Sequence, residues 1–292
     1  MLYLPEGLPA LETLRSEGWP VATYQHAGDS LPLMNHHVAL LNLMPQKMTT
    51  ELDFARVMAA IPERVQLTLV RLKGQTYKTT PLSHVLTFYA DEDALFGSLL
   101  GVDRLVVTGA PLEQMPFEDV RYWPQLTRLM DWARRNVERT LYVCWGAQAG
   151  LYHQYGVNKH GLKEKMFGIF PQEVVHPVGH LMDGLSPRFL MPNSRHTEVR
   201  REEIERAMEG KGLVVAESAK SGVGIVAEQD LRSTYVVGHL EYEPLTLDKE
   251  YKRDLAKQLP IHAPENYYDE EGRAPWSWRT DALRFFYNWM CR

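Results

Sequence analysis

The sequence predicts an α/β protein built around a mainly parallel β-sheet that is flanked by helices. Continuous apolar runs, typical of buried strands, alternate along the chain with segments of helical periodicity. This alternation predicts a parallel sheet covered on both faces, with right-handed crossovers. In such a three-layer arrangement, functional side chains gather at the edge of the sheet where the parallel strands end.

The composition is that of an ordinary globular protein of 292 residues, with 24% charged and 45% hydrophobic residues. The formal net charge of −5 gives no electrostatic reason to expect binding to nucleic acid or to an anionic membrane, so we predict neither partner. No apolar run approaches the ~20 residues that span a bilayer, and the first residues show no secretory signal. A free reactive cysteine suits a reducing compartment, so we predict a cytoplasmic location.

The first half of the chain supplies most of the predicted parallel strands. Residues 1–34 are rich in proline and glycine, hold one short helix near residues 8–17, and are expected to wrap around the sheet rather than join it. A continuous apolar run predicts a buried strand over residues 37–43, and further strands are predicted over residues 65–72 and 103–108. A helix capped by Thr49 or Thr50 and a long amphipathic helix over residues 117–136 complete this half.

The second half shows a weaker pattern. Between residues 165 and 192, glycine and proline interrupt short β-like pieces. Beyond them, the pattern predicts helices over residues 201–208, 249–258 and 280–290, and strands over residues 213–216, 224–227 and 233–237. Residues 260–292 are predicted to form a C-terminal loop and helix. Because no repeat or linker is visible, we predict a single domain over residues 1–292.

Cys144 stands where a short predicted strand turns sharply into a helix. Leu141 to Val143 are β-formers, and small residues follow from Gly146 onwards. This is the geometry of a nucleophile elbow, in which the positive end of the helix favours a thiolate. A buried structural cysteine is the alternative, since free cysteine is often buried. Lys47 and the loop 109–113 also follow predicted strands, so they should share one edge of the sheet with Cys144.

His239 and Glu241 lie two residues apart at the end of the last predicted strand. A strand places residues i and i+2 on the same face, so the carboxylate can orient the imidazole as a general base. Together with Cys144 they form a nucleophile, base and orienter set. His176 and His180 have no partners at metal-ligand spacing, so we predict no metal site. No glycine-rich phosphate-binding motif appears, so nucleotide chemistry is not expected either.

Five motifs resemble the homoserine O-acyltransferases. They are Asn42-Leu43-Met44-Pro45 with Lys47, Thr108-Gly109-Ala110-Pro111-Leu112, Tyr122-Trp123-Pro124, Val143-Cys144-Trp145-Gly146-Ala147-Gln148, and Gly238-His239 with Glu241-Tyr242. The motifs run in the family's order across nearly the whole chain. The resemblance implies the class I glutamine-amidotransferase-like fold, a flavodoxin-like three-layer architecture, and a homodimer.

The resemblance also implies a ping-pong acyl transfer that needs no bound cofactor, only an acyl-CoA co-substrate. Cys144 would attack the thioester, release CoA and hold the acyl group. His239, oriented by Glu241, would then deprotonate the hydroxyl of the amino acid that receives the acyl group. The backbone N–H of Trp145 would donate to the oxyanion, with a second donor such as Leu112 from the preceding loop.

Further positions acquire roles only through this resemblance. Those matching Lys165, Ser194 and Arg253 contact the amino-acid substrate in the family, and the planar fork of an arginine suits an α-carboxylate. Glu113 implies acetyl-CoA as the donor, because a carboxylate in the acyl pocket would repel the free carboxylate of a succinyl group. The expected reaction is therefore acetylation of L-homoserine for methionine biosynthesis. Lys47 is a further candidate, with a catalytic, substrate-contacting or purely packing role.

Some positions depart from the family pattern and leave alternatives open. Leu240 stands where proline is common, Asn193 stands where histidine is common, and Thr280-Asp281 replace the usual Ser-His. Asn193 and the closing segment are expected near the amino-acid pocket, so L-serine is an alternative acceptor, just as succinyl-CoA is an alternative donor. Discrimination of one methylene is worth only ~1–3 kcal/mol. A glutaminase and a non-catalytic binding protein are the competing hypotheses, and Tyr142 stands where glutaminases usually carry glycine.

Overall fold

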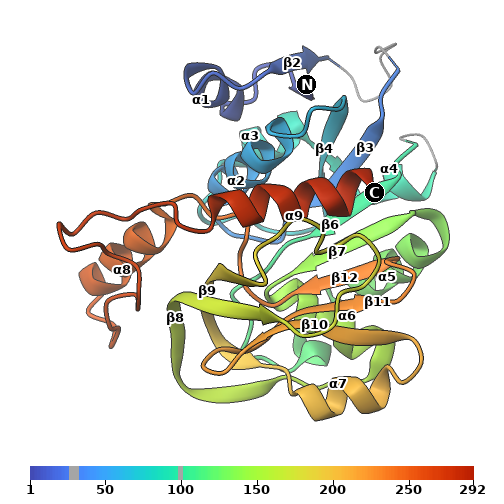
Figure 1. The fold of residues 1–292 in the computed structure, drawn as a ribbon. Coiled ribbons are helices and arrows are strands. Elements are labelled where there is room, and N and C mark those ends of the chain that lie inside the picture. The colour runs from blue at the N-terminus through green and yellow to red at the C-terminus, as the bar shows by residue number, and fades with distance from the viewer. Residues whose placement is uncertain (26–32, 98–100) are drawn as a thin grey trace. The chain divides into compact units, whose positions relative to one another are not determined.

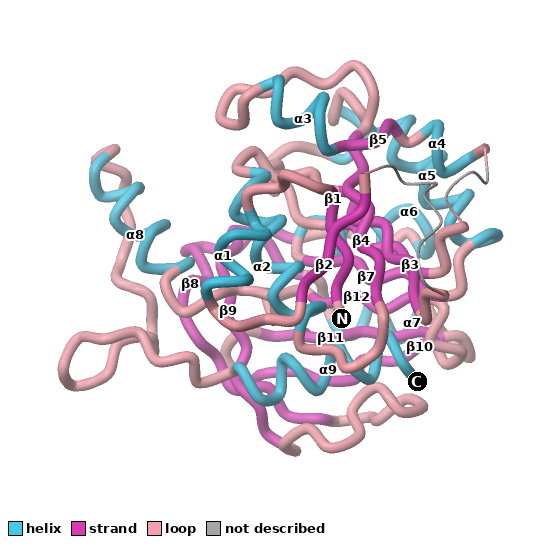
Figure 2. The backbone as a smooth tube through the Cα atoms, turned by 90° about the horizontal axis from the view of Figure 1, so that it is seen from above, coloured by secondary structure: helices cyan, strands magenta, loops and turns pink. Residues whose placement is uncertain are grey.

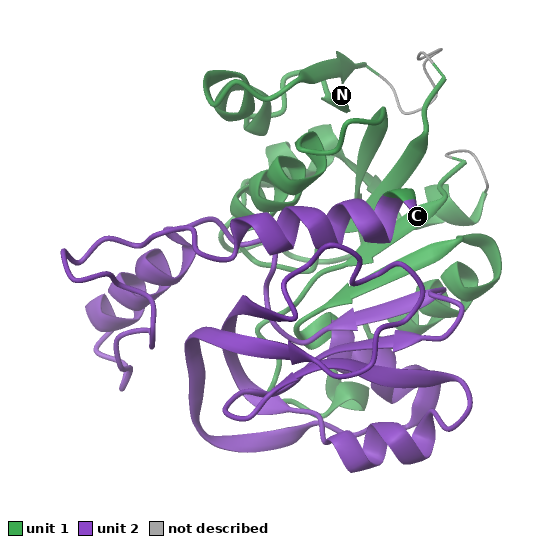
Figure 3. Cartoon of the chain, in the orientation of Figure 1, with its two compact units in different colours: residues 1–146, 291 green, residues 147–290, 292 purple. Residues whose placement is uncertain are grey.

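The computed structural model describes residues 1–25, 33–97 and 101–292. The chain forms two compact units, coloured separately in Figure 3. Unit 1 comprises residues 1–146 together with Cys291, and unit 2 comprises residues 147–290 together with Arg292. Strands and helices occur in both units, so the predicted α/β class is confirmed.

The strands of unit 1 are parallel. In chain order they are β1 (Leu2–Pro5), β2 (Val21–Tyr24), β3 (His36–Leu41), β4 (Val65–Arg71), β5 (Tyr89–Asp91), β6 (Arg104–Val107) and β7 (Arg139–Val143). Within this unit they lie side by side in the order β2-β1-β4-β3-β6-β7, with β5 also paired to β4. Figure 2 shows β1 and β2 next to each other. Strands β3, β4, β6 and β7 are buried along almost their whole length, which explains the continuous apolar run at the end of β3 and the apolar residues of the other three strands.

Helices connect these strands. They are α1 (Ala10–Ser16), α2 (Lys47–Ala59), α3 (Leu82–Phe88), α4 (Asp93–Phe96) and α5 (Trp123–Asn136), with a single 3-10 turn η1 (Phe117–Asp119) before α5. Helix α2 begins before Thr49 and has no side-chain cap, so the predicted cap at Thr49 or Thr50 is wrong. Helix α5 also begins later than predicted, because Pro124 fits only the first turn of a helix and would clash with the preceding turn if the helix had started at Phe117.

The described part of residues 1–34 joins the sheet, contrary to the prediction. The backbone of β1 pairs with β4 on one side and with β2 on the other, so the described part of this segment adds two strands to the sheet instead of wrapping around it. Leu2 and Leu4 are fully buried. Each strand has only four residues, which is too short for a pattern of burial to be visible in the sequence.

Unit 2 is built on antiparallel strands, drawn from green to orange in Figure 1. They are β8 (His160–Val174), β9 (Arg188–Glu198), β10 (Gly212–Ser218), β11 (Gly222–Glu228) and β12 (Ser233–Val236). Their order is β12-β11-β10-β8-β9, and each neighbouring pair is antiparallel. Helix α6 (Trp145–Tyr155) starts at the end of unit 1, and α7 (Arg201–Ala207), α8 (Thr246–Ala256) and α9 (Arg279–Cys291) follow.

The long strands β8 and β9 occupy the region in which the sequence pattern was weakest. Gly168 lies in the middle of β8 with φ of +144°, a conformation that side chains rarely adopt. The backbone of Glu265 packs against it so closely that a Cβ on residue 168 would lie 2.3 Å from the Glu265 carbonyl oxygen. The loop after α8 is thus held against β8 by backbone contacts, at a position where only glycine fits.

None of the helices formed by the described residues is both long enough and apolar enough to cross a bilayer.

Candidate active site

The carboxyl ends of the central strands of unit 1 lie at one edge, as predicted. Leu41 at the end of β3 is level with Val107 of β6, which is level with Tyr142 of β7. Because these strands are parallel, the residues that follow them come next to one another. The backbone N–H of Leu43 donates to Thr108 Oγ1 at 2.8 Å, which ties the loop after β3 to the loop after β6.

Cys144 is the residue between β7 and α6, and it has a φ of +53°. A residue other than glycine seldom adopts this left-handed conformation, and at a turn from strand to helix it is the conformation of a nucleophile elbow. The loop after β6 passes close by: a Cβ at Gly109 would lie 3.2 Å from Cys144 Cβ and 3.6 Å from its Sγ. The side chain is buried, and its nearest loop neighbour is a residue without a side chain.

The first turn of α6 also packs against the loop after β6. A Cβ at Gly146 would lie 2.6 Å from the carbonyl oxygen of Thr108, so this contact requires glycine. The Trp145 indole is fully buried beside the rings of Phe117 and Tyr122, with ring centroids 5.7 and 6.4 Å away. A Cβ at Gly109 would also lie 3.7 Å from the backbone nitrogen of Trp145, and the role of this N–H as an oxyanion donor stays a prediction.

The structure also places Leu112 and Glu113, the two other residues predicted for this loop. The Leu112 N–H donates to the carbonyl oxygen of Ala110 at 2.8 Å, so this donor is already engaged. Glu113 follows at intermediate exposure. Their roles as oxyanion donor and acyl-donor selector stay predictions.

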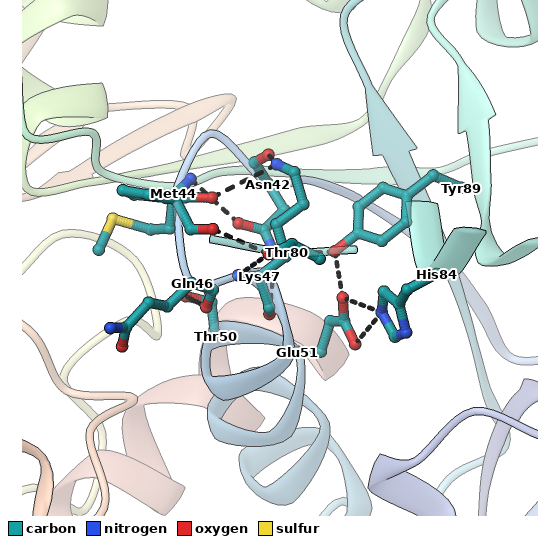
Figure 4. Close-up of polar contacts among 10 residues, drawn as sticks. Asn42, Met44, Gln46, Lys47, Thr50, Glu51, Thr80, His84 and Tyr89 are labelled. Atoms are coloured by element: carbon teal, nitrogen blue, oxygen red, sulfur yellow. Dashed lines mark hydrogen bonds and ion pairs between the residues drawn. The ribbon is translucent and has the colours of Figure 1, made fainter. Parts of the chain in front are cut away.

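Lys47 opens α2 and is almost completely buried. Its ammonium group donates to the carbonyl oxygen of Asn42 and lies 3.4 Å from that of Met44 (Figure 4). The rings of Tyr77 and Tyr89 lie 5.3 and 5.5 Å from Nζ. Burial lowers the pKa of Lys47 to about 8, with Glu51 opposing and Arg71 adding to this effect. Lys47 is therefore a cation inside the protein rather than a solvated surface residue.

His239 and Glu241 meet in unit 2. The Nδ1 atom of His239 lies 2.7 Å from Glu241 Oε1, and both side chains are buried. The ring of Tyr242 stacks on the imidazole, with 4.0 Å between the ring centroids and 10° between the ring planes. The backbone N–H of His239 donates to the carbonyl oxygen of Pro192 at 2.9 Å. Both residues follow β12 in a turn, so their contact comes from the turn rather than from the strand spacing used to predict it.

Lys165, Ser194 and Arg253 also come together in unit 2, and two acidic residues of α8 join them. Lys165 Nζ lies 2.8 Å from a carboxylate oxygen of Glu250 and 3.6 Å from one of Asp254. Ser194 Oγ donates to Glu250 at 2.9 Å. Arg253 donates to Asp254 at 2.7 Å and to Glu250 at 3.3 Å. We call these five residues the α8 cluster.

Charges of opposite sign stabilise one another in the α8 cluster. Hydrogen bonding to Asp254 raises the pKa of the Arg253 guanidinium. Burial alone would raise the pKa of Asp254, but Arg253 and Lys165 outweigh this effect and hold it below its usual value. The sequence analysis missed Glu250 and Asp254, because acidic residues on an amphipathic helix usually face solvent. The only available signal was their position three residues before and one residue after Arg253.

Asn193 lies away from the α8 cluster. It is buried, its Nδ2 donates to the Met191 carbonyl oxygen at 3.2 Å, and its Oδ1 accepts a bond from Arg195 Nε at 3.1 Å. Neighbouring residues of a strand point to opposite faces, so Asn193 and Ser194 cannot line the same surface. The Asn193 side chain is thus engaged within β9, and its expected place near the amino-acid pocket stays a prediction. In the closing segment, Asp281 accepts the backbone N–H of Ser186 at 2.8 Å.

One group of potential metal ligands occurs among the residues that the structure describes: His36, Glu63 and Cys291. His36 Nε2 is already 2.7 Å from Glu63 Oε2. Burial and the Glu63 carboxylate raise the pKa of the Cys291 thiol to about 12, so this sulfur remains protonated and is a poor ligand. The absence of a resident metal stays a prediction.

Comparison with known proteins identifies the family. The sequence profile described as "HTS: Homoserine O-succinyltransferase" matches residues 1–291. Proteins named homoserine O-acetyltransferase are similar over 99% of this chain and 94% of their own length. They include those of Bacteroides fragilis (44% identical), Phocaeicola vulgatus (45%) and Acetivibrio thermocellus (43%).

Solved structures show the same fold at low sequence identity. A glutamine amidotransferase from Thermotoga maritima matches with a TM-score of 0.54 and 13% identity, covering 78% of this chain and 86% of that one. One from Methylobacillus flagellatus matches with a TM-score of 0.53 and 11% identity, covering 88% and 94%. These neighbours confirm the predicted glutamine-amidotransferase-like fold. The profile match over residues 1–291 and the relatives that are 43–45% identical show that this chain belongs to the homoserine O-succinyltransferase family, a family of acyltransferases.

Proposed function

We propose that the protein is a homoserine O-acetyltransferase that transfers an acetyl group from acetyl-CoA to the hydroxyl of L-homoserine. Relatives with this name share 43–45% of the sequence over almost their whole length. The observation that carries the proposal is the α8 cluster, in which Lys165, Ser194 and Arg253 meet Glu250. An α-amino acid carries one positive and one negative group, and a cluster holding both signs of charge is complementary to it.

The reaction begins at the elbow. His239 takes the proton of the Cys144 thiol, and the resulting thiolate attacks the thioester carbonyl of acetyl-CoA. The N–H of Trp145 donates to the oxyanion that forms. The carbon–sulfur bond to CoA breaks, and His239 gives a proton to the departing thiolate. The acetyl group is then bound to Cys144 as a thioester.

The amino acid completes the turnover. His239, again neutral, takes the proton of the homoserine hydroxyl while the oxygen attacks the acetyl-enzyme, and Cys144 leaves as a thiolate. Glu241 holds the imidazole in the tautomer with its proton on Nδ1 and stabilises the imidazolium that forms. Arg253 and Lys165 bind the α-carboxylate, Glu250 takes the α-amino group, and Ser194 orients Glu250.

Glu113 selects the acyl donor. Its carboxylate excludes the second carboxylate of a succinyl group by charge repulsion, so acetyl-CoA is the substrate although the family profile is named for succinyl transfer. Lys47 supplies a fixed positive charge at the same edge of unit 1 as the elbow. One acyltransferase domain over residues 1–292, a homodimer, a cytoplasmic location and no bound cofactor complete the proposal. The profile match over residues 1–291 supports the single domain.

The test is a free-thiol assay of CoA release that crosses acetyl-CoA and succinyl-CoA with L-homoserine and L-serine. We expect fast release only with acetyl-CoA and homoserine. Glu113→Gly should increase the rate with succinyl-CoA by about tenfold or more, whereas Gln114→Gly, an exposed loop neighbour, should not change donor preference. Preference of the unmodified protein for succinyl-CoA or serine would reject that part of the proposal. Glutamine hydrolysis without thioester cleavage would reject all of it.

A further inference from the structure

A chain of buried hydrogen bonds runs from His84 on α3 to Lys47 on α2 (Figure 4). His84 Nε2 lies 2.9 and 3.0 Å from the two carboxylate oxygens of Glu51, and the Tyr89 hydroxyl donates to the first of them. Asn42 Nδ2 donates to the Tyr89 oxygen at 2.9 Å, and Lys47 donates to the Asn42 carbonyl oxygen. None of these five residues is more than 8% exposed. We call them the Lys47 network.

Glu51 is the carboxylate that compensates the buried ammonium. It lies one helical turn after Lys47 on α2, the spacing at which side chains of a helix face one another. The direct acceptors of the ammonium, Asn42 and Met44, are neutral carbonyl oxygens. A buried charge is costly unless an opposite charge and hydrogen bonds balance it.

The other charged groups near Lys47 are balanced among themselves. Arg71 at the end of β4 is the nearby cation whose charge lowers the pKa of Lys47. It forms an ion pair with Asp91 of β5 at 2.7 Å. Glu92 accepts the backbone N–H of Lys73 at 2.8 Å. Tyr77 and Tyr89 face the ammonium with their rings. Burial and the Glu51 charge raise the pKa of Tyr89, so this hydroxyl stays protonated and donates to Glu51.

His84 and Tyr89 fix the carboxylate in one orientation. The imidazole of His84 packs against the rings of Phe88 and Tyr89, with centroids 4.9 and 6.2 Å away, and so cannot turn freely. Two donors from separate elements hold the oxygens of Glu51 and thereby restrain the orientation of the carboxylate. A carboxylate held in this way provides a constant field at Lys47.

We propose that Glu51 is a positioning residue for Lys47: clamped by His84 and Tyr89, it keeps the ammonium charged and fixed at the carboxyl end of β3. The first βα loop then presents one preset positive charge at the edge of unit 1 that also carries Cys144. The effect on Lys47 is independent of the proposed function. Its consequence for turnover rests on that function, because a fixed positive charge favours the anions of acyl transfer.

The test measures protonation of Lys47 directly. Protein labelled with ¹³C at lysine Cε is titrated by NMR, and the Lys47 signal is assigned from its loss in Lys47→Arg. In the unmodified protein the midpoint should lie near pH 8. Glu51→Gln removes the negative charge that favours the ammonium, so the midpoint should fall by about one pH unit or more. Asp53→Asn, the same charge change on another face of α2, should leave it in place.

The pH profile of acetyl-Cys144 formation provides a second readout. The rate should decline at high pH as Lys47 loses its proton. This decline should occur at lower pH in Glu51→Gln and at an unchanged pH in Asp53→Asn. Loss of folding alone would not produce this difference. A protein that titrates as expected but does not cleave thioesters would support the Lys47 network and reject the proposed function. An unchanged Lys47 midpoint in Glu51→Gln would overturn the inference.

A double variant covers the case in which Glu51→Gln does not fold. Removing one partner of a buried charge pair is strongly destabilising, whereas removing both is much less so. Lys47→Met combined with Glu51→Gln should therefore recover folding that Glu51→Gln alone has lost, as measured by thermal unfolding. If the double variant is as unstable as Glu51→Gln, Glu51 serves only His84 and Tyr89, and the inference is wrong.

Discussion

The two units place their functional groups by different physical means. In unit 1, backbone geometry does so: Cys144 has a positive φ, Gly109 packs closely against it, and Gly146 lies against the backbone of Thr108 where a Cβ would clash. In unit 2, contacts between polar side chains do so, as in the ion pair of Lys165 with Glu250 and the contact of His239 with Glu241. The comparison teaches that the candidate residues of unit 1 should be sensitive to added volume and those of unit 2 to the loss of a charged or hydrogen-bonding partner.

The largest effect is expected at the elbow. Cys144→Ala removes the nucleophile and should reduce CoA release by at least about 10³-fold, because the chemical step has no substitute for a lost nucleophile. The matched control is Cys291→Ala, which removes the other free cysteine and should leave the rate unchanged. Substantial activity in Cys144→Ala would show that the elbow is a structural turn.

An intermediate effect, confined to one substrate, is expected in the α8 cluster. Arg253→Met should raise KM for homoserine about 10- to 100-fold, since a charge-assisted contact is worth about 1.5–3 kcal/mol. The rate of acetyl-Cys144 formation in the absence of homoserine should not change. Lys252→Met, on the exposed side of the same helix, should alter neither quantity. An equal loss in both half-reactions would place Arg253 outside the amino-acid site.

The smallest effect tests the sensitivity of unit 1 to volume. Gly146→Ala puts a methyl group within 2.6 Å of the Thr108 carbonyl oxygen and should lower the free energy of unfolding by about 1–3 kcal/mol. Gly161→Ala adds the same methyl group in open space on β8 and should be nearly neutral. Denaturant unfolding of both variants measures the difference. Equal stabilities would mean that the elbow adapts to volume and that the contrast between the units is weaker than described.

The sequence predicted the parts of the fold that carry a repeated signal. Strand β3 ends in a continuous apolar run, and β4 and β6 are also rich in apolar residues, because all three are buried almost throughout. Strands β1 and β2 are too short to show a period, and glycine and proline interrupt the pattern of β8. The antiparallel pairing of unit 2 depends on partners distant in the chain and could not be predicted locally.

The site divides in the same way. Cys144, His239 and Glu241 could be predicted because the motifs that indicate their chemistry are formed by residues close together in the sequence. Glu250 was missed because its partners Ser194 and Lys165 are 56 and 85 positions away. Glu51 was missed for the same reason: its contacts with His84 and Tyr89 join residues 33 and 38 positions apart.

The backbone conformation of Cys144 has an evolutionary consequence. A positive φ at a residue other than glycine costs about 1–3 kcal/mol. Folding alone would therefore favour glycine at this position, and the chemistry of the sulfur is a reason to keep cysteine there. A descendant that no longer needs the reaction should exchange Cys144 for glycine early and become more stable by doing so. The identity of residue 144 thus records which descendants of this gene still perform acyl transfer.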